Sequence, residues 1–104
     1  MSKKDNINKL TNFLALAIVH KIGSVVNPLE LYTAKYKKEA DNYFAQAKAI
    51  SLTENWNLYD KSEIKKITRK KLIDELNKRP YLDEHKFRLI DEEIEKALRK
   101  LDLL

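Results

Sequence analysis

The side chains best placed to do chemistry in this sequence are the lysines and arginines gathered between residues 61 and 79. Eight cations fall in that stretch against three acidic residues, and the whole chain has a formal net charge of +5. Ammonium and guanidinium groups on one helix bind the phosphate backbone of nucleic acids without reading the bases. We therefore predict a phosphate-contacting surface. Its residues are Lys61, Lys65, Lys66, Arg69, Lys70, Lys71, Lys78 and Arg79.

A second interpretation of the same cations is a solvated helix face that keeps a small domain in solution. The isoelectric point of about 9.3 tilts the balance slightly toward a polyanionic partner. Thr68 lies among the cations and adds a hydroxyl group that can donate a hydrogen bond to phosphate. Aromatic side chains are scarce in this stretch, so the sequence does not predict base stacking on single strands.

Catalytic constellations are sparse. The only histidines, His20 and His85, have no second histidine near them in the sequence, and the chain contains no cysteine. A thiolate nucleophile and a cysteine-based metal site are therefore excluded. The acidic run Asp91-Glu92-Glu93 fans out around a helix axis, since consecutive helical residues do not face each other. We predict a protein that is not an enzyme, with no cofactor and no metal site.

The elements that must position the cations are helices. Apolar residues recur at spacings of three and four, and one Gly and two Pro are too few for the tight turns of a hairpin-rich β fold. A chain of 104 residues has room for one hydrophobic core. We predict a single all-α domain over residues 1–104, a small four-helix bundle made of two antiparallel helical hairpins.

Capping signals locate the ends of these helices. An Asp or Asn at the start accepts bonds from the first free amides, Pro suits the first helical position, and Gly suits the residue after the last turn. Residues 53–59 are predicted to be a connector between the second and third helices. The predicted helices run from Asp5 or Asn6 to Gly23, from the box Asn27-Pro28-Glu30 to about Leu52, from Asp60 to Pro80, and from Asp83 toward the C-terminus.

The middle of the first helix is apolar nearly all round. A helix of that kind is buried on several sides or meets a partner. The second helix adds an aromatic stripe, and Trp56 in the connector is expected to fold back as a lid on the core, or alternatively to project toward a partner. We predict a partner surface from these features. Its residues are Phe13, Leu16, Val19, Tyr32, Tyr36 and Trp56.

Together these features predict a non-enzymatic helical accessory subunit of a nucleic-acid-processing complex. It would dock on a larger protein or on a second copy and contact the backbone of DNA or RNA through residues 61–79. The alternative is a DNA-binding transcriptional regulator that dimerises through its first helix. In a helix-turn-helix the second helix reads the major groove, and here that helix carries the acids, which argues against sequence readout.

The apolar run of the first helix ends at His20-Lys21 and is shorter than the ~20 residues that span a bilayer. Polar residues also interrupt the N-terminal pattern of a signal peptide. We therefore expect a cytoplasmic protein with no membrane partner.

Overall fold

Four α-helices and one 3-10 turn make up the fold in the computed structural model, which describes residues 2–27 and 30–104. No strand occurs in these ranges. The small all-α four-helix bundle predicted from the apolar spacing is confirmed. The elements are α1 (Lys3–Val26), α2 (Glu30–Ser51), α3 (Leu58–Asn77), the 3-10 turn η1 (Glu84–Leu89) and α4 (Ile90–Lys100).

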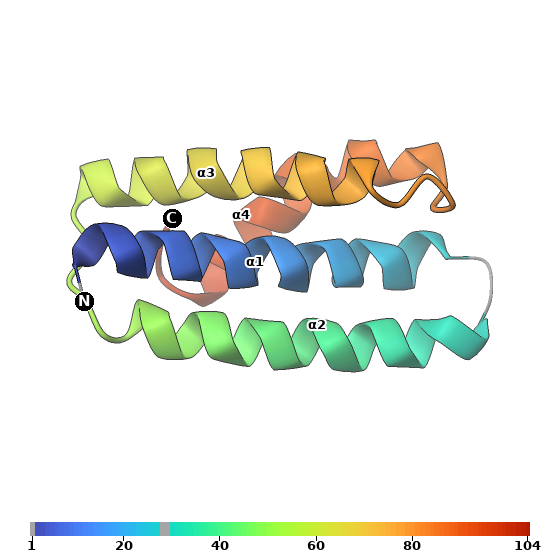
Figure 1. Cartoon of the computed structure of the whole chain (residues 1–104), viewed down its shortest axis with the longest axis horizontal. Coiled ribbons are helices and arrows are strands. Elements are labelled where there is room, and N and C mark those ends of the chain that lie inside the picture. The colour runs from blue at the N-terminus through green and yellow to red at the C-terminus, as the bar shows by residue number, and fades with distance from the viewer. Residues whose placement is uncertain (1, 28–29) are drawn as a thin grey trace.

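Helix α1 is the centre of the bundle. Helix α2 lies antiparallel along one side of α1, α3 lies along the other side, and the shorter α4 covers one face between α1 and α3 (Figure 1). Helix α2 has α1 as its main neighbour, and it meets α4 only through side chains, where the Lys100 ammonium lies 5.8 Å from the centre of the Phe44 ring. This position explains why α1 is apolar nearly all round, because a helix with neighbours on three sides must offer each of them an apolar surface.

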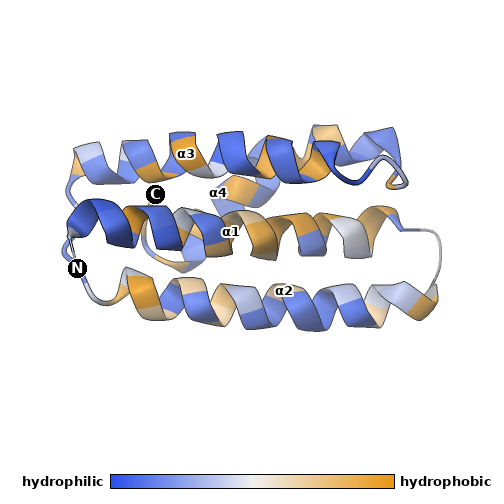
Figure 2. Cartoon of the chain, in the orientation of Figure 1, coloured by the Kyte–Doolittle hydropathy of each residue, from blue (hydrophilic) through white to orange (hydrophobic). Residues whose placement is uncertain are grey.

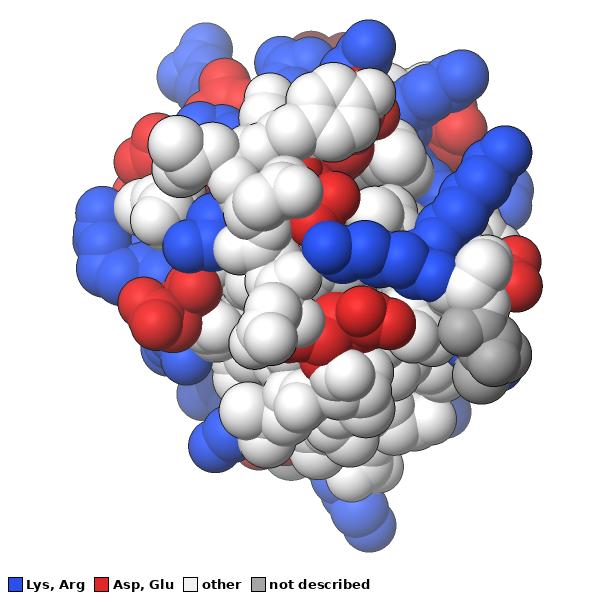
Figure 3. All heavy atoms as spheres, turned by 90° about the vertical axis from the view of Figure 1, so that its left-hand side faces the viewer, with Lys and Arg blue, Asp and Glu red and all other residues white. Residues whose placement is uncertain are grey.

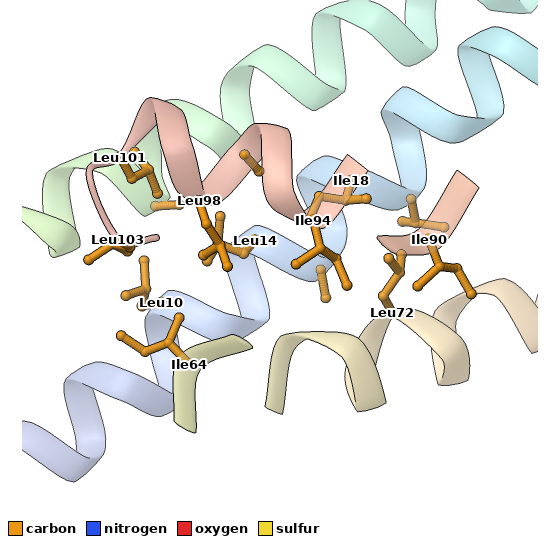
Figure 4. Close-up of a cluster of buried hydrophobic side chains, with 14 of the residues drawn as sticks. Leu10, Leu14, Ile18, Ile64, Leu72, Ile90, Ile94, Leu98, Leu101 and Leu103 are labelled. Atoms are coloured by element: carbon orange, nitrogen blue, oxygen red, sulfur yellow. The ribbon is translucent and has the colours of Figure 1, made fainter. Parts of the chain in front are cut away.

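The core is built mainly from α1, α3 and α4, and Ala47 of α2 also belongs to it. Figure 4 shows side chains from α1, α3 and α4 converging on one cluster. The last residues belong to it too, since Leu103 is 2% exposed and its amide bonds the Leu98 carbonyl at 2.8 Å. Asp102 between them has φ 58°, the left-handed cap that turns the chain back onto its own helix. The core residues labelled in Figure 4 are Leu10, Leu14, Ile18, Ile64, Leu72, Ile90, Ile94, Leu98, Leu101 and Leu103.

Two predicted helix starts were wrong by two or three residues, for the same reason. Ser2 caps α1 and accepts a bond from the Asp5 amide at 3.1 Å, while the Asp5 carboxylate accepts one from the Ser2 amide. Asn57 and Asp60 form the same box at the start of α3. In each box the aspartate that the sequence offers as a cap is the third helical residue, and the true cap lies three positions earlier.

The end of α1 was also predicted too early. Gly23 is buried inside the helix, which continues to Val26, and the Asn27 amide bonds the Gly23 carbonyl at 2.9 Å. A methyl group at position 23 would lie 3.5 Å from the ring of Tyr36, so the glycine sits where α2 passes close to α1. The capping box predicted for α2 involves Pro28 and the side chain of Glu30, which lie outside the described residues.

Asp83 begins a helical segment, as predicted, but the segment is not one regular α-helix. Its carboxylate accepts a hydrogen bond from the His85 amide at 2.8 Å and caps η1. Regular α-helix begins only at Ile90 and has 11 residues. The fourth helix is therefore about half the length of the others.

At 24 residues, α1 is long and apolar enough to cross a membrane by length and composition, which corrects the prediction that it is too short. The central helix of a bundle can have the same length and apolar composition. In α1, 61% of the most apolar 18-residue segment is buried inside the protein. Figure 2 shows the hydrophobic colour concentrated in the middle of α1, whereas α3 is mostly hydrophilic on the side in view.

Candidate nucleic-acid interface

The start of α3, which carries the predicted basic surface, is fixed to the start of α1. The Lys3 ammonium forms an ion pair with the Asp60 carboxylate, and also lies 5.9 Å from the centre of the Trp56 ring. The hydrogen bond from Lys3, and then the one from the Asn57 amide, hold the pKa of Asp60 below its ordinary value. These contacts hold the first turn of α3, and the buried stripe of Ile64, Thr68, Leu72 and Leu76 decides which of its cations face outward.

Two of the predicted cations point into solvent without an acidic partner. Lys66 and Lys70 stand four residues apart on the side of α3 turned away from Ile64, and both are exposed. Neither forms an ion pair with another residue that the structure describes. They are one helical turn apart and can contact a polyanion together.

Two further cations of α3 form ion pairs with acidic residues of the neighbouring helix α4. The Lys65 ammonium lies 3.7 Å from the Glu95 carboxylate, and the Arg69 guanidinium bonds Asp91 at 3.0 Å. All four side chains are about half exposed or more. Ion pairs this exposed are worth little, so a phosphate can displace the carboxylates at low cost.

The remaining predicted cations serve the fold. The Lys71 ammonium donates to the Asn8 carbonyl at 3.1 Å and to the Thr11 hydroxyl at 2.7 Å, and burial lowers its pKa. Arg79 and Lys78 both pair with Glu75, at 2.8 and 3.3 Å. The bond from Arg79 is the main reason that the pKa of Glu75 is lowered. Lys71 and Arg79 therefore do not extend the free surface of α3, whereas Lys78, whose side chain is 69% exposed, lies at the far end of the helix, two turns beyond Lys70.

Lys61 and Thr68 also lie away from that free surface. Lys61 is half-buried and lines a hollow at the end of the bundle with Trp56 and Leu101. Thr68 is 0% exposed, so the prediction that its hydroxyl is available to phosphate was wrong. It sits on the core side of α3, one turn after Ile64, where its methyl group packs and its hydroxyl finds no hydrogen-bond partner among the described residues.

The six residues of the predicted partner surface do not form one patch. Phe13 and Leu16 are half-buried and line a groove of about 630 Å³ between α1 and α3. Val19 is 1% exposed and belongs to the core, where no partner reaches it. Tyr32 is 46% exposed near the start of α2. Tyr36 is half-buried against Gly23, and its pKa is raised by burial and then by the hydroxyl of Tyr81.

Trp56 lies back on the core as a lid, one of the two alternatives that the sequence allows. Its indole N–H donates to the Ser51 carbonyl at 2.8 Å, and its ring packs against the hydrophobic cluster. The connector is further fixed by Asn6, whose amide donates to the Glu54 carboxylate at 2.9 Å. The chain therefore crosses from α2 to α3 over the start of α1, along a defined path.

The end of the bundle crossed by this connector is neither basic nor acidic as a whole. Figure 3 looks along the helices at that end and shows Lys and Arg interleaved with Asp and Glu around a broad uncharged area. Leu52 and Leu58, on either side of the connector, are 77% and 85% exposed. Mixed charge of this kind does not favour a polyanion, so this end adds nothing to the candidate interface on the outer side of α3.

The surroundings of two buried ionisable side chains are the features that sequence reasoning missed, although a half-buried His20 was expected. His20 is buried between α1 and α2, with the rings of Tyr36 and Tyr43 at 5.8 and 5.3 Å. Glu93 of α4 is 6% exposed, and the Lys21 ammonium lies 2.9 Å from its Oε2. The residue types gave no signal, because a charged side chain on an apolar face looks the same in the sequence whether or not it has a partner.

These buried charges do not form a metal site. No group of three or more potential metal ligands comes together among the described residues. His85 is exposed in the short turn η1, far along the chain from His20. The buried ionisable side chains instead form pairs that join one helix to another.

Comparison with known proteins adds no family to this description: no family model, curated protein or solved structure matches the chain.

Proposed function

We propose that this chain is a non-enzymatic helical interaction protein that contacts the phosphate backbone of DNA or RNA through the outer side of α3. The observation that carries the proposal is the pair Lys66 and Lys70, exposed one turn apart and without an acidic partner among the described residues. The role fits an accessory subunit of a nucleic-acid-processing complex. The net charge of +5 supports attraction to a polyanion over a distance.

The contact is expected to be weak and independent of sequence. Two free cations, with Lys65 and Arg69 joining them when phosphate displaces their carboxylates, make at most four phosphate contacts. The logarithm of the affinity for duplex then falls with the logarithm of salt concentration with a slope of about −0.9 per contact. Such a protein adds affinity to a larger assembly and leaves the choice of sequence to another component.

The alternative, a sequence-specific regulator, has less support. A recognition helix must enter the major groove, and the helix that follows α3 exposes Asp91, Glu92 and Glu95 on its surface. These carboxylates repel the phosphates on both sides of a groove. A regulator would also bind its own site about 10³-fold or more tighter than random duplex.

A salt series with random duplex and single-stranded RNA tests the proposal. The double variant K66E/K70E should abolish binding at low salt, or reduce the salt slope by about 2. The matched control K4E/K37E makes the same change in net charge at exposed lysines of α1 and α2. Equal losses in both variants would mean that net charge alone is responsible, and no binding by the unmodified chain at low salt would end the proposal.

A further inference from the structure

The side of α2 turned away from α1 is exposed to solvent, because the backbone of α2 approaches no other described element and α4 reaches α2 only near Phe44. Two large apolar side chains mark its ends, Leu31 at 81% exposed and Leu52 at 77%. The Leu52 amide still bonds the Lys48 carbonyl at 3.2 Å, so this residue continues the helical face. The exposed residues on the face are Leu31, Ala34, Lys38, Asp41, Asn42, Ala45, Ala49 and Leu52.

The two ends of this face carry the same residue types, a leucine followed one turn inward by an alanine, with Asp41 and Asn42 at its centre. From Leu31 the steps along the face are three, four and three residues to Asp41, and backward from Leu52 they are three, four and three to Asn42. A helix laid antiparallel on its own copy places each residue opposite its mirror position. Leu31 then meets Leu52 of the other copy, and Ala34 meets its Ala49.

We infer that the outer face of α2 binds a second copy of this chain, with the two α2 helices antiparallel about a two-fold axis between Asp41 and Asn42. A two-fold interface uses the same patch on both copies, which requires a self-complementary surface of this kind. The leucines cover each other at both ends. The alanines let the helix axes approach to the ~8 Å of closely packed helices.

Charge supports the same register. Lys38 of one copy lies opposite Ala45 of the other, one helical turn from that copy's Asp41. Within its own chain, neither Lys38 nor Asp41 forms an ion pair with a described residue, although both are exposed. The two Asp41 carboxylates come close to each other near the axis, and each is flanked by the Lys38 ammonium of the opposite copy. The alternation of charges allows the helices to approach without net repulsion.

The dimer should be weak and concentration-dependent. Helix α2 has 22 residues, and a helix of that length presents a contact only about 33 Å long. One helix on one helix buries less than the ~800 Å² per partner of a standard interface. The arrangement also leaves α3 of each copy facing outward, since α2 and α3 flank α1 on opposite sides (Figure 1). The inference does not depend on the proposed function, although it would give that function two basic faces.

The oligomeric state is the first test. Light scattering of the unmodified full chain, from low micromolar to millimolar concentration, should show a rise from monomer to dimer. The variant L31E/L52E should remain a monomer throughout, because four carboxylates would meet at the ends of the interface. The control L58E/Y59E alters two apolar side chains in the first turn of α3 that are 85% and 72% exposed, and should dimerise normally. Circular dichroism checks that each variant keeps its helices.

A charge exchange tests the register. K38D alone and D41K alone should each raise the dissociation constant at least tenfold, because each brings like charges together across the interface. The double variant K38D/D41K should return it to near the original value. Failure of the double variant to recover would overturn the register.

Cross-linking tests the direction of the helices, and the chain is suited to it because it contains no cysteine. A mixture of A34C and A49C should form a disulfide between the two variants on oxidation. Neither variant alone should cross-link with itself, since the like positions are about 22 Å apart in the antiparallel pair. Self-cross-links of A34C, absence of any cross-link, or a chain that stays monomeric at millimolar concentration would each overturn the inference.

Discussion

His20 of α1 and Glu39 of α2 join the two helices, with the imidazole Nε2 2.8 Å from the carboxylate Oε2. The other ring nitrogen, Nδ1, lies 2.6 Å from the Leu16 carbonyl. Carbonyl and carboxylate oxygens only accept hydrogen bonds, so each ring nitrogen faces an acceptor on a different helix or turn. The imidazole side chain is 9% exposed and Glu39 35%, so most of the cost of breaking the pair falls on the histidine.

Replacing this histidine should therefore destabilise the bundle more than replacing the glutamate. His20→Ala loses both hydrogen bonds and leaves a cavity, which costs about 2–3 kcal/mol. Glu39→Gln still accepts the bond from Nε2 and loses only its charge, which costs about 1 kcal/mol or less. Urea unfolding of the two variants beside the unmodified chain measures both values. Equal losses would mean that the carboxylate charge dominates the contact.

Gly23 can be replaced with a gain in stability. It lies inside α1 with helical neighbours on both sides, where glycine costs about 0.5–1 kcal/mol relative to alanine. The added methyl group would lie 3.5 Å from the Tyr36 ring, an ordinary contact distance. Gly23→Ala should raise the melting temperature. Gly23→Leu, which must push into the ring, should lower it, and thermal unfolding of the pair distinguishes backbone from packing effects.

Asp102 is a second position where a substitution should raise the stability of the fold through the backbone conformation. Its φ of 58° is a left-handed conformation that side chains other than glycine adopt at a cost of about 1 kcal/mol. Asp102→Gly should recover about that amount while keeping the bond from the Leu103 amide to the Leu98 carbonyl. Asp102→Ala keeps the cost and serves as the control. A loss of stability in the glycine variant would show that the carboxylate itself holds the C-terminal cap.

Acid should weaken the fold through two carboxylates. The pKa of Asp60 is lowered by its bond from Lys3, and that of Glu75 by its bond from Arg79. A carboxylate whose pKa is lower in the folded than in the unfolded state stabilises the fold at neutral pH, and this contribution is lost as the pH falls. The free energy of unfolding should therefore decrease below about pH 4.5, the ordinary value for Glu75.

The variant D60N/E75Q isolates this contribution. It should be less stable than the unmodified chain at pH 7, and the difference should shrink as the pH is lowered. Chemical unfolding at a series of pH values provides the measurement. A difference that stays constant with pH would show that the two side chains act through packing.

The sequence alone determined the helices, the absence of strands from the described residues and most of the core, because these depend on spacings and caps within a few residues. The stripe at Ile90, Ile94 and Leu98 is apolar in the sequence and buried in the structure. The boxes at Ser2 and Asn57 are equally local. Their misassigned starts reflect the fact that a box contains two residues able to cap, and only the backbone shows which of them is outside the helix.

Only the tertiary structure decided which cations are free. Three lysines of α3 look alike in the sequence but have different surroundings. Lys65 faces an acidic residue of α4, Lys66 faces solvent, and Lys71 bonds the backbone of α1. Consecutive helical residues point about 100° apart, and each direction meets whatever element the fold places there. Those elements come from distant parts of the chain, so their charges could not be paired with α3 until the helices were packed.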